Sequence, residues 1–178
     1  TLQEGDLFVA LCGDTFDGHN FLEHAAQAGA LGALVSRLPP LPPLDNGPSL
    51  PATFSLFFVP DTLQALQDLA AHVWPELERD GVRTIAVTGS NGKTTVKEML
   101  RALWSSQGTV YATPGNWNNH IGLPLTILNA SPECETIIVE MGTNHFGDIE
   151  LLTTIAPSNV RMVTSIGHAH LENLGDLS

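Results

Sequence analysis

Apolar residues in the second half of the chain alternate between the spacing of strands and the spacing of helices. Short, nearly continuous apolar runs predict buried strands, and apolar residues three or four positions apart predict amphipathic helices between them. The resulting order is strand 84–88, helix 94–106, strand 109–112, helix 122–129, strand 136–141, helix 147–156 and strand 160–166. Strands that are apolar along their length and alternate with helices are typical of a parallel sheet covered on both faces.

The helix predicted at 94–106 has a marked apolar pattern. Its apolar residues at helical spacing are Val96, Met99, Leu100, Leu103 and Trp104. Residues three and four positions apart lie on the same side of a helix. We therefore expect all five to form the face that packs on the sheet.

The first 80 residues follow a shorter version of this pattern. Its predicted elements are strand 7–11, helix 21–30, strand 33–35, strand 54–59 and helix 61–79. Six of the twelve prolines fall within residues 39–51, which predicts a loop there. The rhythm changes near residues 80–82. We therefore expect an α/β protein with a small N-terminal α/β domain (1–80), followed by the first half of a P-loop-type parallel-sheet domain (81–178).

A glycine-rich turn links strand 84–88 to the following helix and reads Thr88-Gly-Ser-Asn-Gly-Lys-Thr-Thr95. Glycines at such a turn let backbone N–H groups approach phosphate oxygens, and the helix N-terminus adds partial positive charge. Lys93 is placed to reach the outer phosphates, and the hydroxyl of Thr94 is placed to hold Mg²⁺. Strand, turn and helix in this order predict a site for the phosphates of a nucleotide.

The spacing of the glycines makes this turn a variant of the common phosphate loop. The common pattern has a glycine five positions before the second one, and here position 87 is Val. Gly89 and Gly92 are instead three positions apart. The alternative interpretation is an ordinary glycine-rich turn before a helix, with Lys93 as a solvated charge.

Charge and composition narrow the class of partner. The net charge is −12 with seven Lys plus Arg residues, which argues against a nucleic-acid surface. A nucleotide remains compatible, because one lysine and backbone amides neutralise phosphates locally. Cys12 and Cys134 show no paired spacing, which favours the cytoplasm. No apolar run reaches the roughly 18 residues of a membrane span. For the oligomeric state, we expect a monomer.

Two polar clusters follow other strands, and ligands of open parallel sheets bind beyond such strand ends. Gly115-Asn-Trp-Asn-Asn-His120 follows strand 109–112 and offers uncharged amides to a substrate. An ordinary asparagine-rich turn is the alternative. Glu140 ends an apolar run, where a carboxylate beside a phosphate loop is well placed to bind Mg²⁺. A solvated strand-end charge is the alternative for Glu140.

His168-Ala-His-Leu-Glu172 follows the last predicted strand. Two histidines two positions apart on an extended chain face the same way. Three interpretations are open: a zinc-binding pair, a magnesium or phosphate contact by one histidine, and a structural role. The zinc interpretation lacks a third ligand. The remaining histidines have no partner spacing and are assigned surface or core roles: His19, His24, His72 and His145.

The loop Thr88–Thr95 resembles the ATP loop of the Mur ligases, which build the peptidoglycan stem peptide. The resemblance covers nearly the whole chain through these segments: Gly5–Leu11, Phe16–His19, Gly115–Asn119, Ile121–Pro124, Val139–His145 and Ala169–Glu172. The ATP loop alone also fits a folylpolyglutamate synthetase. The asparagine cluster and the Ala-His-Leu-Glu element favour the Mur branch that adds D-Ala-D-Ala to UDP-MurNAc-tripeptide.

The resemblance implies a role for each matching residue. It implies that the ATP phosphates are bound by Gly89, Ser90, Asn91, Gly92, Lys93, Thr94 and Thr95. It implies that Thr94 and Glu140 hold Mg²⁺ and that His170 helps to hold a second Mg²⁺ near the acyl phosphate. Lys93 and His170 are thus the expected catalytic residues.

The resemblance also implies contacts with the UDP-sugar-peptide. The expected substrate-binding residues are Asn116, Asn118 and Asn119, with Asp14, Thr15 and Phe16 against the uridine end. His120 departs from the acidic residue expected at its position. The resemblance implies that residues 1–80 correspond to the UDP-sugar-substrate domain, incomplete at its start, and residues 81–178 to the central ATP-binding domain, incomplete at its end.

The implied activity is ATP-dependent amide ligation in peptidoglycan precursor synthesis, and hence in cell-wall biogenesis, cell shape and cell division. ATP converts a carboxylate into an acyl phosphate, D-Ala-D-Ala attacks it, and phosphate leaves. The chain is expected to be a fragment that does not complete this reaction alone. In the family, a modified lysine, the adenine contacts and the amine-binding domain lie beyond the position of residue 178, and further uridine contacts lie before residue 1.

Other functions stay open at this point. A sister Mur ligase adding a different amino acid shares the same loop. Another P-loop NTPase or kinase is expected to place an aspartate, rather than Glu140, at the strand end. A non-catalytic UDP-sugar-binding module keeps the fold without needing Lys93. The third residue of the acceptor peptide is not defined by these motifs.

Overall fold

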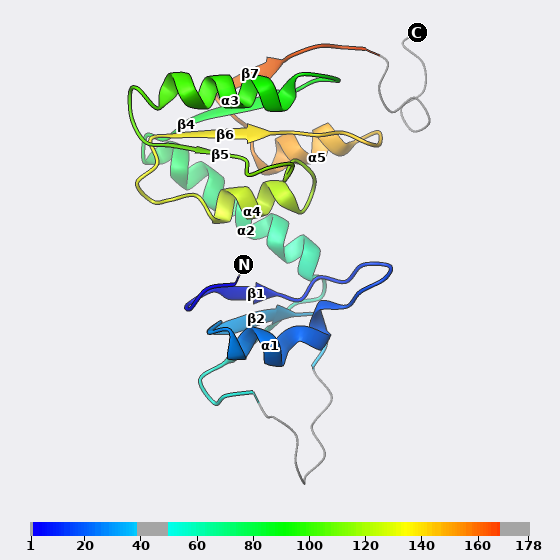
Figure 1. The fold of residues 1–178 in the computed structure, drawn as a ribbon. Coiled ribbons are helices and arrows are strands. Elements are labelled where there is room, and N and C mark those ends of the chain that lie inside the picture. Colours follow the sequence, from blue (N-terminus) through cyan, green and yellow to red (C-terminus); the bar gives the residue numbers. More distant parts are fainter. Residues whose placement is uncertain (1, 39–49, 168–178) are drawn as a thin grey trace. The chain divides into compact units, whose positions relative to one another are not determined.

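The computed structural model describes residues 2–38 and 50–167, and Figure 1 shows its fold. The chain divides into two compact units between Leu66 and Gln67. This division falls inside helix α2 (Thr62–Arg79), whose buried Ala70 and Trp74 belong to the core of the second unit. The boundary near residue 80 that the sequence suggested lies at the other end of the same helix, and the two domain assignments remain proposals.

The first unit is a small three-stranded parallel sheet in the order β1-β2-β3. Its strands are β1 (Leu7–Val9), β2 (Gly32–Val35) and β3 (Ser55–Phe58), and its helices are the 3₁₀ turn η1 (Gly18–Phe21) and α1 (Leu22–Gln27). Every residue of β2 is buried, as expected for the central strand. The strand predicted at 7–11 ends at Val9, because the chain then turns and Gly18 N–H donates to Leu11 O at 2.8 Å.

The second unit is a four-stranded parallel sheet in the order β5-β6-β4-β7. Its strands are β4 (Arg83–Thr88), β5 (Val110–Ala112), β6 (Thr136–Glu140) and β7 (Val160–Val163), and its helices after α2 are α3 (Lys93–Trp104), α4 (Gly122–Leu128) and α5 (Asp148–Ile155). All of the buried strand positions of this second sheet lie in the neighbouring strands β4 and β6. The predicted α/β class with parallel strands is confirmed.

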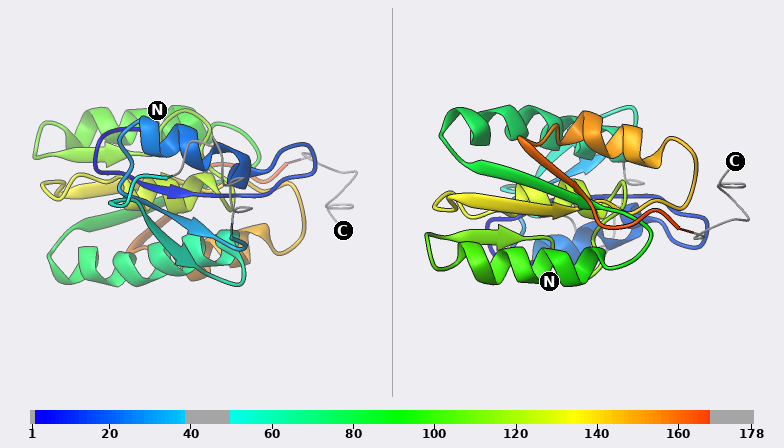
Figure 2. Two further views of the ribbon diagram at one scale, coloured as in Figure 1. Left: turned by 90° about the horizontal axis from the view of Figure 1, so that it is seen from below. Right: turned by 90° about the horizontal axis from the view of Figure 1, so that it is seen from above.

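Helices cover both faces of this second sheet. One core joins Trp74 of α2, Leu123 and Ile127 of α4, and Leu152 of α5 to the sheet. The opposite core is smaller and lies under α3. Figure 2 (right) shows α3 on one side of the sheet and α2 and α5 on the other. The parallel strands therefore point their carboxyl ends to one edge, where the loops before α3, α4 and α5 meet.

The apolar face predicted for α3 is only partly correct. Val96, Leu100 and Trp104 pack on the sheet, whereas Met99 and Leu103 are 66% and 57% exposed. The buried arc is rotated away from these two residues, because it also contains Lys97, which is 1% exposed. A lysine on the buried face of a helix is the main departure from the sequence pattern.

Within the described residues, no helix is long and apolar enough to cross a membrane. The motif around His168 and His170 and most of the proline-rich segment lie outside these residues.

The two cysteines have different environments. Cys12 is exposed, whereas Cys134 is buried in the larger core, and burial raises the pKa of its thiol. Because only the thiolate reacts, we expect an alkylating reagent to modify Cys12 in the native protein and Cys134 about two orders of magnitude more slowly, after local opening. Mass spectrometry of the two peptides measures both rates. Equal modification rates of the two cysteines in the folded protein contradict the expectation. In denaturant, where both thiols are accessible, the two rates should be equal, and this measurement is the control.

Candidate active site

The phosphate loop follows β4 and ends at the first residue of α3. Gly89 and Gly92 have positive φ angles of 131° and 83°, which a residue with a side chain rarely adopts. Lys93 begins the helix, and its Nζ donates to Gly89 O at 2.7 Å. The loop therefore curls over its own lysine.

The segment after β7 supports this loop. Ser90 N–H donates to Ser165 O at 2.9 Å, and Asn91 N–H donates to Ser165 Oγ at 3.0 Å. The hydroxyl of Thr164 donates to Asn91 O at 2.6 Å. A Cβ on Gly89 clashes with Thr164 and Ser165, so the close approach requires glycine there. Residues 73 to 75 positions apart thus define the loop's shape.

Glu140 ends β6 beside the loop and is 1% exposed. Its Oε2 accepts from Thr94 Oγ1 at 2.9 Å, and its Oε1 accepts from Asn118 Nδ2 at 2.8 Å. Its backbone N–H donates to Thr113 Oγ1 at 2.9 Å. The strand-end carboxylate predicted from the sequence is therefore buried and hydrogen-bonded to Thr94 and Asn118, and it is not a solvated charge.

The asparagine cluster lies in the loop between β5 and α4. Asn118 contacts Glu140 through its side chain, and its backbone oxygen accepts from Gly142 N–H at 2.7 Å. Asn119 Oδ1 accepts from the N–H groups of Ile121 and Gly122, and so caps the start of α4. Asn116 is exposed. The three asparagines expected to bind substrate thus lie in three different local environments.

A cavity of about 190 Å³ opens among these loops. The lining residues most relevant to chemistry are Lys93, Asn118, Asn119, His120, His145 and Asp148. They come from the phosphate loop, the asparagine loop and the loop that joins β6 to α5. The structure therefore brings Lys93 together with two of the three asparagines that the sequence predicts to bind substrate, and Asn116 is not among the lining residues.

Sequence reasoning missed two features of this site. His145 is a surface residue, as the sequence suggested, with a side chain that is 69% exposed, but it also lines the cavity with Asp148, its Nδ1 lying 3.8 Å from Asp148 Oδ2. The sequence pattern assigns no role to Lys97, which lies four residues after Lys93 on the buried side of α3. Its position among the apolar residues of the helix was the available signal.

Asp148 accepts hydrogen bonds from two backbone N–H groups, of Asn144 at 2.7 Å and His145 at 2.8 Å. These donors, that of Asn144 first, hold the pKa of the carboxyl below its ordinary value. A lowered folded pKa stabilises the fold above the unfolded pKa of about 3.9, and this contribution disappears as the pH falls through the folded value.

We therefore expect the Asp148 carboxyl carbon to titrate below pH 3.9 in an NMR experiment, where 3.9 is roughly the unperturbed value. Asp148→Asn is expected to flatten the dependence of unfolding free energy on pH in that acidic window. Glu150→Gln, on the exposed side of the same helix, serves as the control. A midpoint at or above the unperturbed value contradicts the expectation.

The residues expected to contact the uridine end of the substrate lie in the first unit. Asp14, Thr15 and Phe16 form a tight exposed loop, in which Gly13 N–H donates to Phe16 O at 2.9 Å. Phe16 also lines an apolar pocket of about 360 Å³, together with Phe8 and Phe21. This pocket offers apolar and aromatic surface but little hydrogen bonding.

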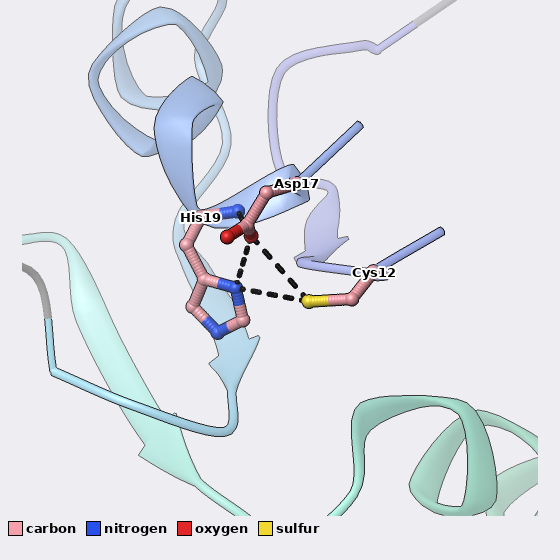
Figure 3. Close-up of side chains that lie close together, drawn as sticks. All are labelled: Cys12, Asp17 and His19. Carbon is pink, nitrogen blue, oxygen red and sulfur yellow. Dashed lines mark hydrogen bonds and ion pairs between the residues drawn. The ribbon is translucent and has the colours of Figure 1, made fainter. Parts of the chain in front are cut away.

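Cys12, Asp17 and His19 form a compact cluster beside that loop (Figure 3). His19 Nε2 accepts from Ser36 N–H at 3.0 Å, so the ring proton lies on Nδ1 and is shared with Asp17 Oδ1 at 2.7 Å. Asp17 also pairs with Arg37. Each polar group already has a protein partner, and the cluster is best described as a hydrogen-bonded brace for the loop.

Fold and site together define the class of protein: an α/β nucleotide-binding protein with a variant phosphate loop and a buried carboxylate at the neighbouring strand end. The model of the Mur ligase middle domain matches residues 87–178, which is more than half of the chain. The chain therefore belongs to the Mur ligase family, and the resemblance seen in the sequence is confirmed.

Several similar proteins share one name, UDP-N-acetylmuramoyl-tripeptide–D-alanyl-D-alanine ligase. The Bacillus subtilis protein is 43% identical over 174 residues and the Escherichia coli protein 41% over 177 residues. The alignments cover 98% and 99% of this chain but 36% of each relative. The chain thus spans about a third of the length of these relatives.

Solved structures of the same name are similar in fold. MurF from Acinetobacter baumannii has a TM-score of 0.81 and 36% identity, covering 98% of this chain and 36% of that one. MurF ligase from Thermotoga maritima in complex with ADP has a TM-score of 0.75 and 37% identity, covering 96% and 36%. The nucleotide in the second structure is ADP, the product form of ATP.

Proposed function

We propose that the protein is an ATP-dependent amide ligase that adds D-Ala-D-Ala to UDP-MurNAc-tripeptide in peptidoglycan precursor synthesis, in the bacterial cytoplasm. Its 1–80 segment is proposed to take part in binding the UDP-sugar substrate, and its 81–178 segment to bind ATP. The shared name of the relatives supports the reaction.

One observation carries this proposal: Glu140 joins the two halves of the site. Its carboxylate contacts Thr94 of the phosphate loop on one oxygen and Asn118 of the asparagine loop on the other. A ligase must hold the γ-phosphate of ATP against a second substrate, so it needs these two loops in one rigid arrangement. A simple NTPase has no need to link its phosphate loop to a second substrate loop.

The proposed reaction has two steps. A carboxylate oxygen of the UDP-linked peptide attacks the γ-phosphorus of ATP, the bond to the bridging oxygen breaks, and ADP leaves. The amine of D-Ala-D-Ala then attacks the carbonyl carbon of the acyl phosphate, inorganic phosphate leaves, and the amine loses a proton. In this proposal Lys93 offsets the repulsion between the two anionic substrates, which is supported by its place among the residues that line the cavity.

Mg²⁺ fits the donors at this site. The hydroxyl of Thr94 and the carboxylate of Glu140 are oxygen ligands that lie 2.9 Å apart, and hard cations prefer such ligands. When bound, Mg²⁺ neutralises phosphate charge. The second magnesium contact expected from His170 is part of the proposal and lies outside the described residues.

The test is phosphate release from ATP by the full-length protein. Release that requires both UDP-MurNAc-tripeptide and D-Ala-D-Ala, and that is lost in Lys93→Ala, is the expected result. Release without either substrate indicates a general NTPase. Binding of the UDP-sugar without any release indicates a non-catalytic module. Release with another amino acid in place of D-Ala-D-Ala indicates a sister ligase.

A further inference from the structure

Lys97 is a lysine whose side chain is almost completely removed from solvent, at 1% exposure. It lies on α3, four residues after Lys93, and so faces the same side of the helix. Burying an ammonium group is costly unless it is paired and hydrogen-bonded. The contacts of its ammonium group therefore indicate the role of Lys97.

The ammonium group of Lys97 contacts the start of the asparagine loop. Its Nζ donates to Thr113 O at 2.8 Å and to Gly115 O at 3.4 Å. Thr113 also holds Glu140, because its Oγ1 accepts from the Glu140 N–H at 2.9 Å. The ammonium group of Lys97 thus holds, through hydrogen bonds, the stretch of backbone that leads into Asn116–Asn119.

The same ammonium lies near two carboxylates. Nζ is 3.9 Å from Glu140 Oε2 and 3.3 Å from Glu98 Oε1. Glu140 is as deeply buried as Lys97, whereas the Glu98 side chain is 46% exposed. Lys97 is therefore the buried positive charge opposite the carboxylate that also contacts Thr94 and Asn118.

We infer that Lys97 is a positioning residue that couples the phosphate loop to the substrate loop by holding Glu140 and the Thr113–Gly115 backbone in one place. It does not touch ATP or the acceptor in this role and acts through Glu140. Lys93 and Lys97, one helical turn apart, thus have separate tasks. The expected effect on kcat rests on the proposed function. The expected effect on the affinity for ATP does not, because it can be measured without the acceptor.

Lys97→Met in the full-length protein tests the inference, because methionine preserves the bulk of the chain without the charge. We expect a folded protein whose kcat falls roughly 10- to 100-fold and whose Kd for ATP in Mg²⁺ rises about as much, the usual loss when a supporting contact of a metal site is removed. In a double-mutant cycle with Glu140→Gln, the two losses are expected to be strongly non-additive. Calorimetric nucleotide binding supplies a readout that is independent of turnover.

Arg101→Met is the matched control, since it removes a positive charge from the exposed side of the same helix. Lys97→Gln keeps a hydrogen-bond donor and is measured if Lys97→Met does not fold. The inference is overturned by a folded Lys97→Met that binds and turns over like the Arg101→Met control, by additive losses in the cycle, or by loss of folding in both variants. Failure of the wild-type protein to release phosphate overturns the proposed function instead, and the binding cycle still decides the role of Lys97.

Discussion

Glu140→Gln is expected to lower substrate-dependent phosphate release by about 100- to 1,000-fold, the usual loss when one preorganised electrostatic group is removed. Glutamine keeps the size of the side chain and can still accept one hydrogen bond. It removes the negative charge that faces Lys97 at 3.9 Å and contacts Thr94 at 2.9 Å. Among the described residues, the buried ammonium then keeps only two backbone oxygens and the half-exposed Glu98 as partners.

The same substitution is expected to lower the free energy of unfolding by roughly 1–3 kcal/mol, because a buried polar network loses a charged partner. Steady-state phosphate release and thermal unfolding measure the two effects. Glu150→Gln, an exposed carboxylate on α5, is the control and should change neither. An active Glu140→Gln variant with normal affinity for Mg²⁺ and ATP rules out the proposed role of the strand-end carboxylate.

Lys93→Met is expected to reduce kcat by about 1,000-fold with little change in stability, since it removes a charge at the reacting phosphates. Lys93 is half-buried, and its ammonium has one hydrogen bond in the described residues, to Gly89 O at 2.7 Å. Removing it therefore leaves no deeply buried partner unsatisfied. The contrast with Lys97→Met, which is expected to affect stability and activity together, separates the two lysines.

Measurement of kcat beside the melting temperature gives this contrast directly. Arg101→Met again controls for the loss of a positive charge from α3. If Lys93→Met retains more than about a tenth of wild-type turnover, well above the expected loss, the variant glycine spacing of the loop does not serve phosphate binding and the alternative of a solvated surface lysine is correct.

Local features of the site were predictable because they depend on neighbours in the sequence. Gly89 and Gly92 mark the turn, and Lys93 directly follows it. The apolar runs predict β4 and β6 because both strands are buried on two faces. The strand-end position of Glu140 follows from the length of its apolar run.

Contacts between distant segments were not predictable in the same way. That Asn118 bonds to Glu140, whereas Asn119 caps α4, depends on how the loop after β5 folds back over β6. His145 has no partner spacing in the sequence, yet the loop before α5 brings it into the cavity. Periodicity describes which side of an element is buried and carries no information on which polar groups meet across a sheet edge.

The sequence by itself determined the alternation of strands and helices, the phosphate loop and the family, because these depend on local periodicity and on short motifs. Only the tertiary structure decided that Lys97 is buried, that Met99 and Leu103 are exposed, and that Glu140 joins two loops. The physical reason is the order β5-β6-β4-β7, which places β6 between the strands that carry the two loops. A carboxylate at the end of that strand is thereby within hydrogen-bonding distance of both.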